Sequence, residues 1–95
     1  MAADFEIRPA RRADAAEIAR LIRELADYEK LSAEAVGTPA LLEAQLFGPR
    51  PAAEALVALA GGRAVGFALF FTTFSTFLCK PGLYLEDLFV EPAHR

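Results

Sequence analysis

Two adjacent carboxylates, Glu86 and Asp87, stand inside an otherwise apolar stretch, Leu83–Val90. Neighbouring side chains of a strand point to opposite faces, so we expect one carboxylate to meet an apolar environment unless a bulge intervenes. A carboxyl group there needs a partner or its pKa rises, and a raised pKa beside a pocket suits a general base. Strand chemistry alone leaves an alternative open, in which both groups are solvated at a strand edge or paired with Arg8 or Arg63.

The sequence contains few residues suited to metal binding, to nucleophilic catalysis or to phosphate binding. His94 is the only histidine, which leaves little for a metal site or a His-dependent triad, and we expect no metal. The single cysteine, Cys79, excludes an internal disulfide and fits a reducing compartment. Its neighbour Lys80 favours the thiolate, whereas simple packing of the thiol at a strand end is the alternative. Gly61-Gly62 is interpreted as a hairpin turn rather than a phosphate cradle, because a strand and not a helix follows it.

Two helices are predicted to position these residues. The first begins at Asp14, where Glu17 completes a capping-box pattern. Its apolar stripe has the helical spacing i, i+3, i+4, i+7 and consists of Ile18, Leu21, Ile22 and Leu25. Its other face carries Arg20, Arg23, Glu24 and Asp27. The second helix begins at Thr38-Pro39 and ends at Gly48-Pro49, and residues 29–37 form a loop.

Four strands complete the predicted fold. Their ranges are Phe5–Arg8, Ala55–Ala60, Ala64 to about Phe77, and Leu83–Val90. Turns at Gly61-Gly62 and Lys80-Pro81-Gly82 join the last three strands, which are therefore antiparallel. The order β-α-α-β-β-β predicts a single α/β domain over residues 1–95, with an α+β layout. Two helices cover one face of a four-stranded, mainly antiparallel sheet. The third strand is apolar on both faces, so the other face needs cover from another copy, another chain or a missing segment.

Composition narrows the class of protein. The chain has 55% hydrophobic residues, above the usual share of about 45–50%, and a net charge of −3, which gives no electrostatic footprint for nucleic acid. The longest apolar run, Ala64–Cys79, is too short for a membrane span and is rich in Phe and Thr. Residues 1–4 show no secretory signal, and we expect a cytoplasmic protein.

The block Leu83–Arg95 resembles the fourth strand and the opening of the phosphate loop in the GNAT superfamily of N-acetyltransferases. That family continues with an Arg/Gln-x-x-Gly-x-Gly/Ala loop, of which Arg95 would be the first residue. Phe5–Ala10 and the first helix resemble the family's first strand and helix. Leu25–Glu29 together with Tyr84–Asp87 resembles its diamine (spermidine/spermine) branch. The resemblance covers nearly the whole chain but only the N-terminal half of the acyl-CoA N-acyltransferase fold.

The resemblance implies transfer of an acetyl group from acetyl-CoA to a small, polyamine-like amine. The positions that match the family's site are Leu88, Phe89, Val90 and Arg95 for the cofactor, Tyr28, Glu29 and Asp87 for the amine, and Glu86 for proton removal. The strand backbone would bind the pantetheine arm, and one N–H would polarise the thioester carbonyl. Glu86 would accept the ammonium proton through water. For Tyr28 and Glu29 the alternative is a helix end on which an aromatic ring packs.

The sequence also departs from the family. The loop glycines, the second parallel strand and the tyrosine that protonates the leaving thiolate have no counterpart here, so we expect the chain alone to be inactive. We expect a homodimer or a separately supplied C-terminal half as partner. An alternative hypothesis is a non-enzymatic dimerisation or interaction module, built on the exposed sheet face and the edge of the fourth strand. A third is a small-molecule binding domain unrelated to acetyl transfer.

Overall fold

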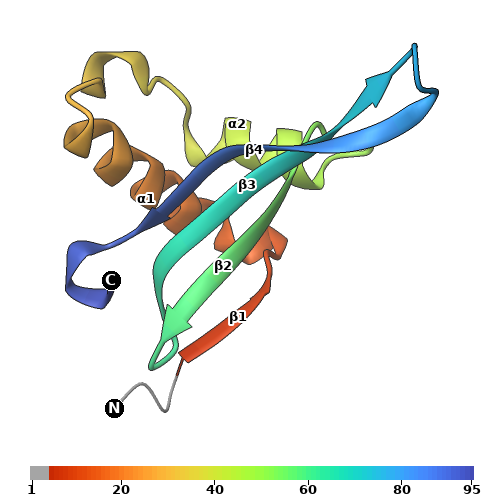
Figure 1. Cartoon of the computed structure of the whole chain (residues 1–95). Coiled ribbons are helices and arrows are strands. Elements are labelled where there is room, and N and C mark those ends of the chain that lie inside the picture. Colours follow the sequence, from red (N-terminus) through yellow and green to blue (C-terminus); the bar gives the residue numbers. More distant parts are fainter. Residues whose placement is uncertain (1–4) are drawn as a thin grey trace.

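The computed structural model describes residues 5–95 (Figure 1). Residues 1–4, on which the expectation of no secretory signal depends, lie outside this range. The elements, in order, are β1 (Phe5–Pro9), α1 (Ala15–Tyr28), α2 (Pro39–Phe47), β2 (Glu54–Ala60), β3 (Arg63–Ser75) and β4 (Lys80–Val90). Short 3-10 turns span Arg12–Asp14, Ser32–Glu34 and Pro92–His94. The strands form one antiparallel sheet in the order β1-β2-β3-β4, which confirms the predicted topology.

Helix α1 forms because its apolar stripe faces the sheet. Ile18 and Leu21 are fully buried against the core strands. The predicted capping box at its start is wrong. The Asp14 carboxylate accepts hydrogen bonds from the Arg8 guanidinium at 2.7 and 3.1 Å and from the Arg11 backbone N–H, so it ties β1 to the helix entry instead of capping α1. Arg8 holds the pKa of Asp14 below its usual value.

Helix α2 has the predicted boundaries. The Thr38 hydroxyl accepts a hydrogen bond from the Leu41 N–H at 3.2 Å, and proline occupies the first helical position. The helix stops at Gly48, where an added Cβ would lie 2.4 Å from the Ala44 carbonyl oxygen. Leu46 is the side chain through which α2 enters the core.

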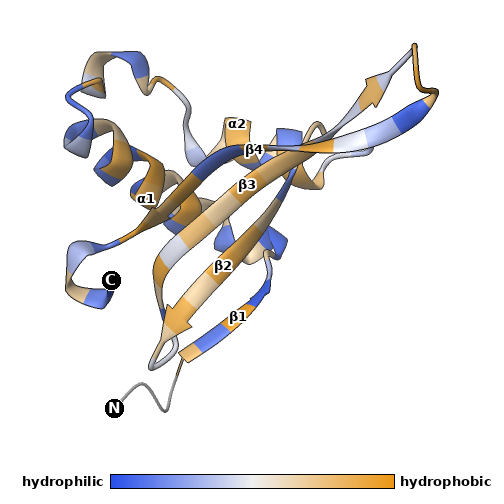
Figure 2. Cartoon of the chain, in the orientation of Figure 1, coloured by the Kyte–Doolittle hydropathy of each residue, from blue (hydrophilic) through white to orange (hydrophobic). Residues whose placement is uncertain are grey.

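The two faces of the sheet differ in cover, as predicted. Both helices lie on the same side (Figure 1) and bury Val57, Phe67 and Phe89. The opposite face is apolar as well, and its residues include Ile7, Leu56, Phe70, Leu85 and Leu88. Figure 2 shows the resulting hydrophobic colouring along the central strands β2 and β3. The 3-10 turn after β4 brings the His94 ring edge-to-face against Phe5 of β1.

The β3–β4 connection differs from the prediction. The turn is Thr76–Cys79, not Lys80-Pro81-Gly82, and β3 ends at Ser75. Cys79 takes the left-handed conformation (φ 54°), so the chain reverses before the proline. Pro81 is tolerated inside β4 because β4 is an outer strand and a missing N–H costs little there. The strands therefore extend into an arm that projects from the body (Figure 1).

The run Ala64–Cys79 lies in this hairpin, in line with its interpretation as strand. Across residues 5–95, no helix combines the length and apolar character that crossing a membrane requires.

Candidate functional site

A β-bulge brings the two adjacent carboxylates to one cleft. Leu69 pairs with Asp87 and Phe70 pairs with Leu85, so Glu86 is the extra residue in β4. The alternation that would separate Glu86 from Asp87 is interrupted there, and both residues line the same cleft of about 290 Å³ between β4 and the end of α1. The other lining residues are Ile22, Leu25, Ala26, Glu29, Leu31, Glu34 and Ala35.

The cleft is acidic, and its charges repel one another. Burial raises the pKa of the Asp87 carboxyl above its usual value, and the nearby charges of Glu86 and Glu29 raise it further. A carboxyl group with a raised pKa was expected in this strand, and it is Asp87. A bound cation would relieve the repulsion between these groups, because it would neutralise part of the accumulated negative charge.

The predicted alternative partners of the two carboxylates are engaged elsewhere. Arg8 pairs with Asp14, and Arg63 donates to Glu91 at 2.9 Å. Pairing of Glu86 or Asp87 with Arg8 or Arg63 is therefore wrong. The solvated alternative holds for Glu86, which is exposed, whereas Asp87 is half-buried.

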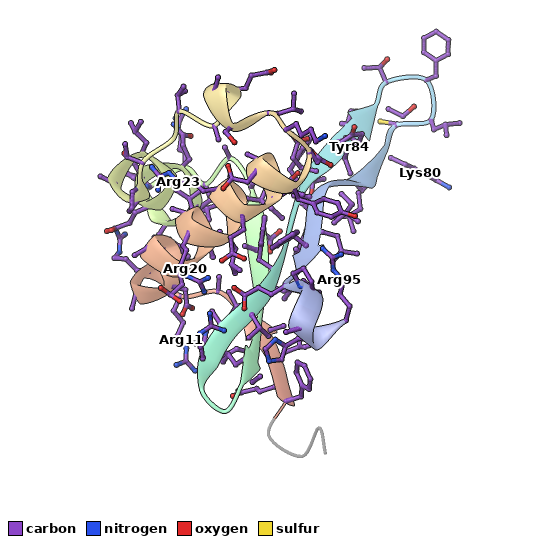
Figure 3. All side chains as sticks on the ribbon, turned by 90° about the vertical axis from the view of Figure 1, so that its left-hand side faces the viewer. Arg11, Arg20, Arg23, Lys80, Tyr84 and Arg95 are labelled. Atoms are coloured by element: carbon purple, nitrogen blue, oxygen red, sulfur yellow. The ribbon has the colours of Figure 1, made fainter. Side chains whose placement is uncertain are left out.

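Tyr28 and Arg95 meet beside this cleft. The Arg95 guanidinium lies 5.0 Å from the centre of the Tyr28 ring and 5.5 Å from the centre of the Phe89 ring. Its Nε donates a hydrogen bond to the Val90 carbonyl oxygen at 2.7 Å. Figure 3 shows Arg95 on the segment that follows β4 and Lys80 far away on the arm.

The end of β4 presents its backbone at the outer edge of the sheet. Residues 88–90 pair with β3 on one side, and no strand among the described residues pairs with their other side. The Phe89 ring points into the core, whereas the Leu88 side chain is exposed on the open face. At the paired side the backbones are close, since a Cβ added to Gly66 would lie 2.9 Å from the Phe89 carbonyl oxygen.

Several proteins with related sequences are N-acetyltransferases. Thialysine N-epsilon-acetyltransferase of Mus musculus is 38% identical over an alignment 101 positions long, which covers 98% of this chain and 59% of the mouse protein. Spermidine/spermine N(1)-acetyltransferase-like protein 1 of Homo sapiens is 37% identical over an alignment 98 positions long, which covers 96% of this chain and 14% of that protein. The chain is a relative of the GNAT acetyltransferases. It corresponds to their N-terminal portion.

Solved structures support the same fold. A possible acetyltransferase from Clostridium difficile 630 superimposes with a TM-score of 0.77 at 21% identity, over 96% of this chain and 60% of that one. Ribosomal-protein-alanine N-acetyltransferase from Brucella melitensis biovar Abortus 2308 gives a TM-score of 0.73 at 26% identity, over 96% and 59%. No protein-family model matches the chain. The chain thus spans about three fifths of the length of the mouse relative and of both structures.

One polar cluster of this GNAT-type sheet was missed by the sequence prediction. The Glu91 carboxylate accepts hydrogen bonds from Arg63 and from Arg20, both at 2.9 Å, and Arg20 also donates to the Ala64 carbonyl oxygen at 2.8 Å. These contacts, with Arg63 first, lower the pKa of Glu91 to about 2. Arg20 and Glu24, predicted on the free face of α1, are half-buried in this network. Only the i, i+4 spacing of Arg20 and Glu24 hinted at a pairing.

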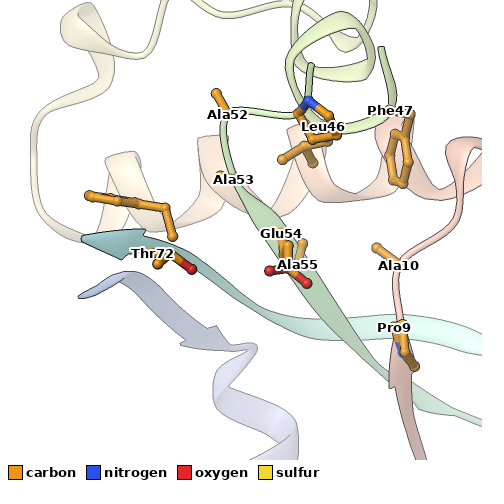
Figure 4. A pocket seen from close by; sticks show the side chains of 11 residues that line it. Pro9, Ala10, Leu46, Phe47, Ala52, Ala53, Glu54, Ala55 and Thr72 are labelled. Carbon is orange, nitrogen blue, oxygen red and sulfur yellow. The ribbon is translucent and has the colours of Figure 1, made fainter. Parts of the chain in front are cut away.

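A second, more voluminous cavity within residues 5–95 is not the candidate site. It measures about 520 Å³ and lies between the end of α2 and strands β2 and β3 (Figure 4). Glu54 is the only ionisable residue among those that line it, so it has no convergent groups for catalysis. Within residues 5–95, no three His, Cys, Asp or Glu side chains cluster closely enough to hold a metal ion.

Proposed function

We propose that this chain contributes the amine site and part of the cofactor site of a cytoplasmic N-acetyltransferase that acts on a small, polyamine-like amine. The observation that carries the proposal is the convergence of Glu29, Glu34, Glu86 and Asp87 on one cleft beside β4. A cationic amine fits a cleft with this charge, and apolar Leu25 and Leu31 supply contacts for a methylene chain. The names of the relatives, thialysine and spermidine/spermine acetyltransferases, support an amine as acceptor.

In this proposal the carboxylates of the cleft have two different roles, proton removal and binding of the cation. Glu86, which is exposed and bulged, accepts the proton of the substrate ammonium through water, since an ammonium has no lone pair for attack. Asp87 and Glu29 hold the cation beside it, with Tyr28 at the rim. The raised pKa of Asp87 supports this assignment, because a bound cation favours the charged form, which burial and the neighbouring carboxylates disfavour.

The residues present fit one end of acetyl-CoA and not the other. The outer edge of β4 at Leu88, Phe89 and Val90 has backbone groups on a side that no described strand covers, which suits a pantetheine arm. For the phosphate end the resemblance offers only Arg95, whose guanidinium lies against Tyr28 and Phe89 in this structure, and no glycine follows Gly82 in residues 83–95 to form an anion cradle. When bound, the cofactor supplies a thioester carbonyl that the amine attacks. We therefore expect weak cofactor binding and no useful acetyl transfer by residues 1–95 alone.

Reconstitution tests this proposal. The chain is joined after Arg95 to the corresponding C-terminal portion of the mouse relative, and acetyl transfer to spermidine and to thialysine is measured against pH. We expect activity, and we expect Glu86→Gln to lower the rate at pH 7 by about 10²-fold or more and less above pH 9, where free amine is abundant. Glu6→Gln, an exposed carboxylate on β1, is the matched control. An unchanged pH profile for Glu86→Gln would remove Glu86 as the proton acceptor.

A second candidate function, a non-enzymatic interaction module, is favoured by the open sheet face. Ile7 and Leu88 are 70% and 66% exposed there, and both are large and apolar. Such a surface, next to the outer strand β4, favours pairing with a second copy or with a separate C-terminal half. Light scattering coupled to size exclusion distinguishes the possibilities, since a monomer at micromolar concentration would argue against a homodimer.

A further inference from the structure

The Arg95 guanidinium lies against two aromatic rings, as a bound organic cation would. A guanidinium within about 6 Å of a ring centroid is attracted by the negative face of the ring, and here one guanidinium satisfies this criterion for both Tyr28 and Phe89. No salt bridge among residues 5–95 involves Arg95. Among residues 5–95, the guanidinium contacts the two rings and the Val90 carbonyl oxygen, and the side chain is otherwise exposed to solvent.

We infer that Tyr28 and Phe89 form a binding subsite for an organic cation, a primary ammonium or a guanidinium, and that Arg95 occupies this subsite from within the chain. The two rings of the subsite differ in how much of each is exposed to solvent. Phe89 is 4% exposed and fixed in the core layer, whereas Tyr28 is 64% exposed at the end of α1. One wall is therefore rigid, and the other is accessible to a ligand from solvent.

The position of the subsite gives it a role in the proposed amine site. Phe89 and Asp87 lie on the same face of β4 two residues apart, a separation of about 7 Å. Glu29, whose charge contributes to the raised pKa of Asp87, directly follows Tyr28. A cation on the rings thus lies in the negative field of the cleft. This orientation toward the cleft rests on the proposed function, whereas cation binding by the two rings does not.

Arg95 then acts as an internal competitor. A ligand cation that binds to both rings must displace the Arg95 guanidinium, and the energy of the Arg95 contact lowers the ligand's apparent affinity. An exposed cation–π contact is worth about 0.5–1 kcal/mol, which corresponds to a twofold to fivefold change in affinity. Replacing Arg95 by a neutral residue frees the rings, whereas replacing it by lysine keeps a competing cation.

The experiment measures binding of n-butylammonium to the purified chain by NMR, with no acetyl-CoA present. Tyr84→Phe serves as the background, because it leaves Tyr28 as the only tyrosine and makes its ring signals unambiguous. We expect n-butylammonium to shift the Tyr28 and Phe89 ring signals, and neutral n-butanol to shift them much less. In this background Arg95→Gln should bind about twofold to fivefold tighter, and Arg95→Lys should stay close to Arg95.

Tyr28→Leu, followed through the Phe89 ring, should weaken binding by a similar factor. This variant is safe for folding because Tyr28 is mostly exposed. Equal affinity in the Arg95→Gln and Arg95→Lys chains, or equal shifts with butanol, would overturn the inference. Because acetyl transfer is not measured, a failure of this subsite is distinguishable from a failure of the proposed activity.

Discussion

The two faces of this sheet have similar side chains and opposite environments. On the helix side, Ile18 of α1 is completely buried against Val57 and Phe67. On the other side, Ile7 of β1 is 70% exposed, although it has the same side chain. The arm is more exposed still, since Phe77 at its tip is 99% accessible. Folding stability therefore comes from the covered face, and the open face and the arm are available for contacts that residues 5–95 do not themselves make.

Truncating one isoleucine on each side gives the largest expected contrast. Ile18→Ala should lower the free energy of unfolding by about 3 kcal/mol, because it removes buried apolar surface and leaves a cavity. Ile7→Ala should change it by less than about 0.5 kcal/mol. Urea denaturation followed by circular dichroism measures both. Equal losses would mean that the open face is covered in solution.

The next effect concerns the ion network that holds α1 against the ends of β3 and β4. Glu91→Gln should cost about 1–3 kcal/mol at pH 7, since it leaves Arg20 and Arg63 without their shared carboxylate. The pKa of Glu91 is depressed from 4.5 to about 2, so the folded state binds fewer protons than the unfolded state. The stabilisation is present above pH 4.5 and is lost as the pH falls toward 2.

The acid dependence provides the control for this network. Glu91→Gln should show a shallower loss of stability between pH 4.5 and 2 than the parent chain. The slope that remains is expected from Asp14, whose pKa Arg8 lowers. Glu43→Gln, which removes a more exposed pair with Arg12, should leave the slope unchanged. An identical acid slope in the Glu91→Gln chain would show that Glu91 does not anchor α1.

On the covered face of the sheet, Asp87 is half-buried and has no salt bridge with any residue of the described range 5–95. Its raised pKa means that the folded state binds protons more readily than the unfolded state, so its charge opposes folding above that pKa and less so at lower pH. Asp87→Asn should therefore stabilise the chain at pH 7 by about 0.5 kcal/mol or less, because solvent screens the cleft. Thermal melts at pH 7 and pH 4 test this, and destabilisation at pH 7 would contradict it. A stabilising loss of charge is typical of a site kept for binding rather than for folding.

Local signals in the sequence predicted much of this architecture. The apolar stripe of α1, the Thr38 cap and the Gly61-Gly62 turn, where φ is 57° and 82°, need only neighbouring residues. The bulge at Glu86 depends on the register between β3 and β4, and Glu91 meets Arg20 across 71 positions. Such features arise only when distant segments meet. The turn at Lys80-Pro81-Gly82 was predicted wrongly because a proline in an outer strand looks, in sequence, like a proline in a turn.

The smallest change in stability, and the sharpest test of the open face, comes from polar substitutions there. Ile7→Thr combined with Leu88→Thr should leave the free energy of unfolding within about 0.5 kcal/mol of the parent, because both side chains are already largely in water. If the face pairs with a second copy, the same double variant should weaken dimerisation at least tenfold in sedimentation equilibrium. Phe77→Ser at the arm tip is the matched control and should leave the association unchanged. If instead Phe77→Ser weakened dimerisation and the double variant did not, the contact between copies would lie on the arm. Both surfaces are exposed and apolar, so this pair of variants is what distinguishes them.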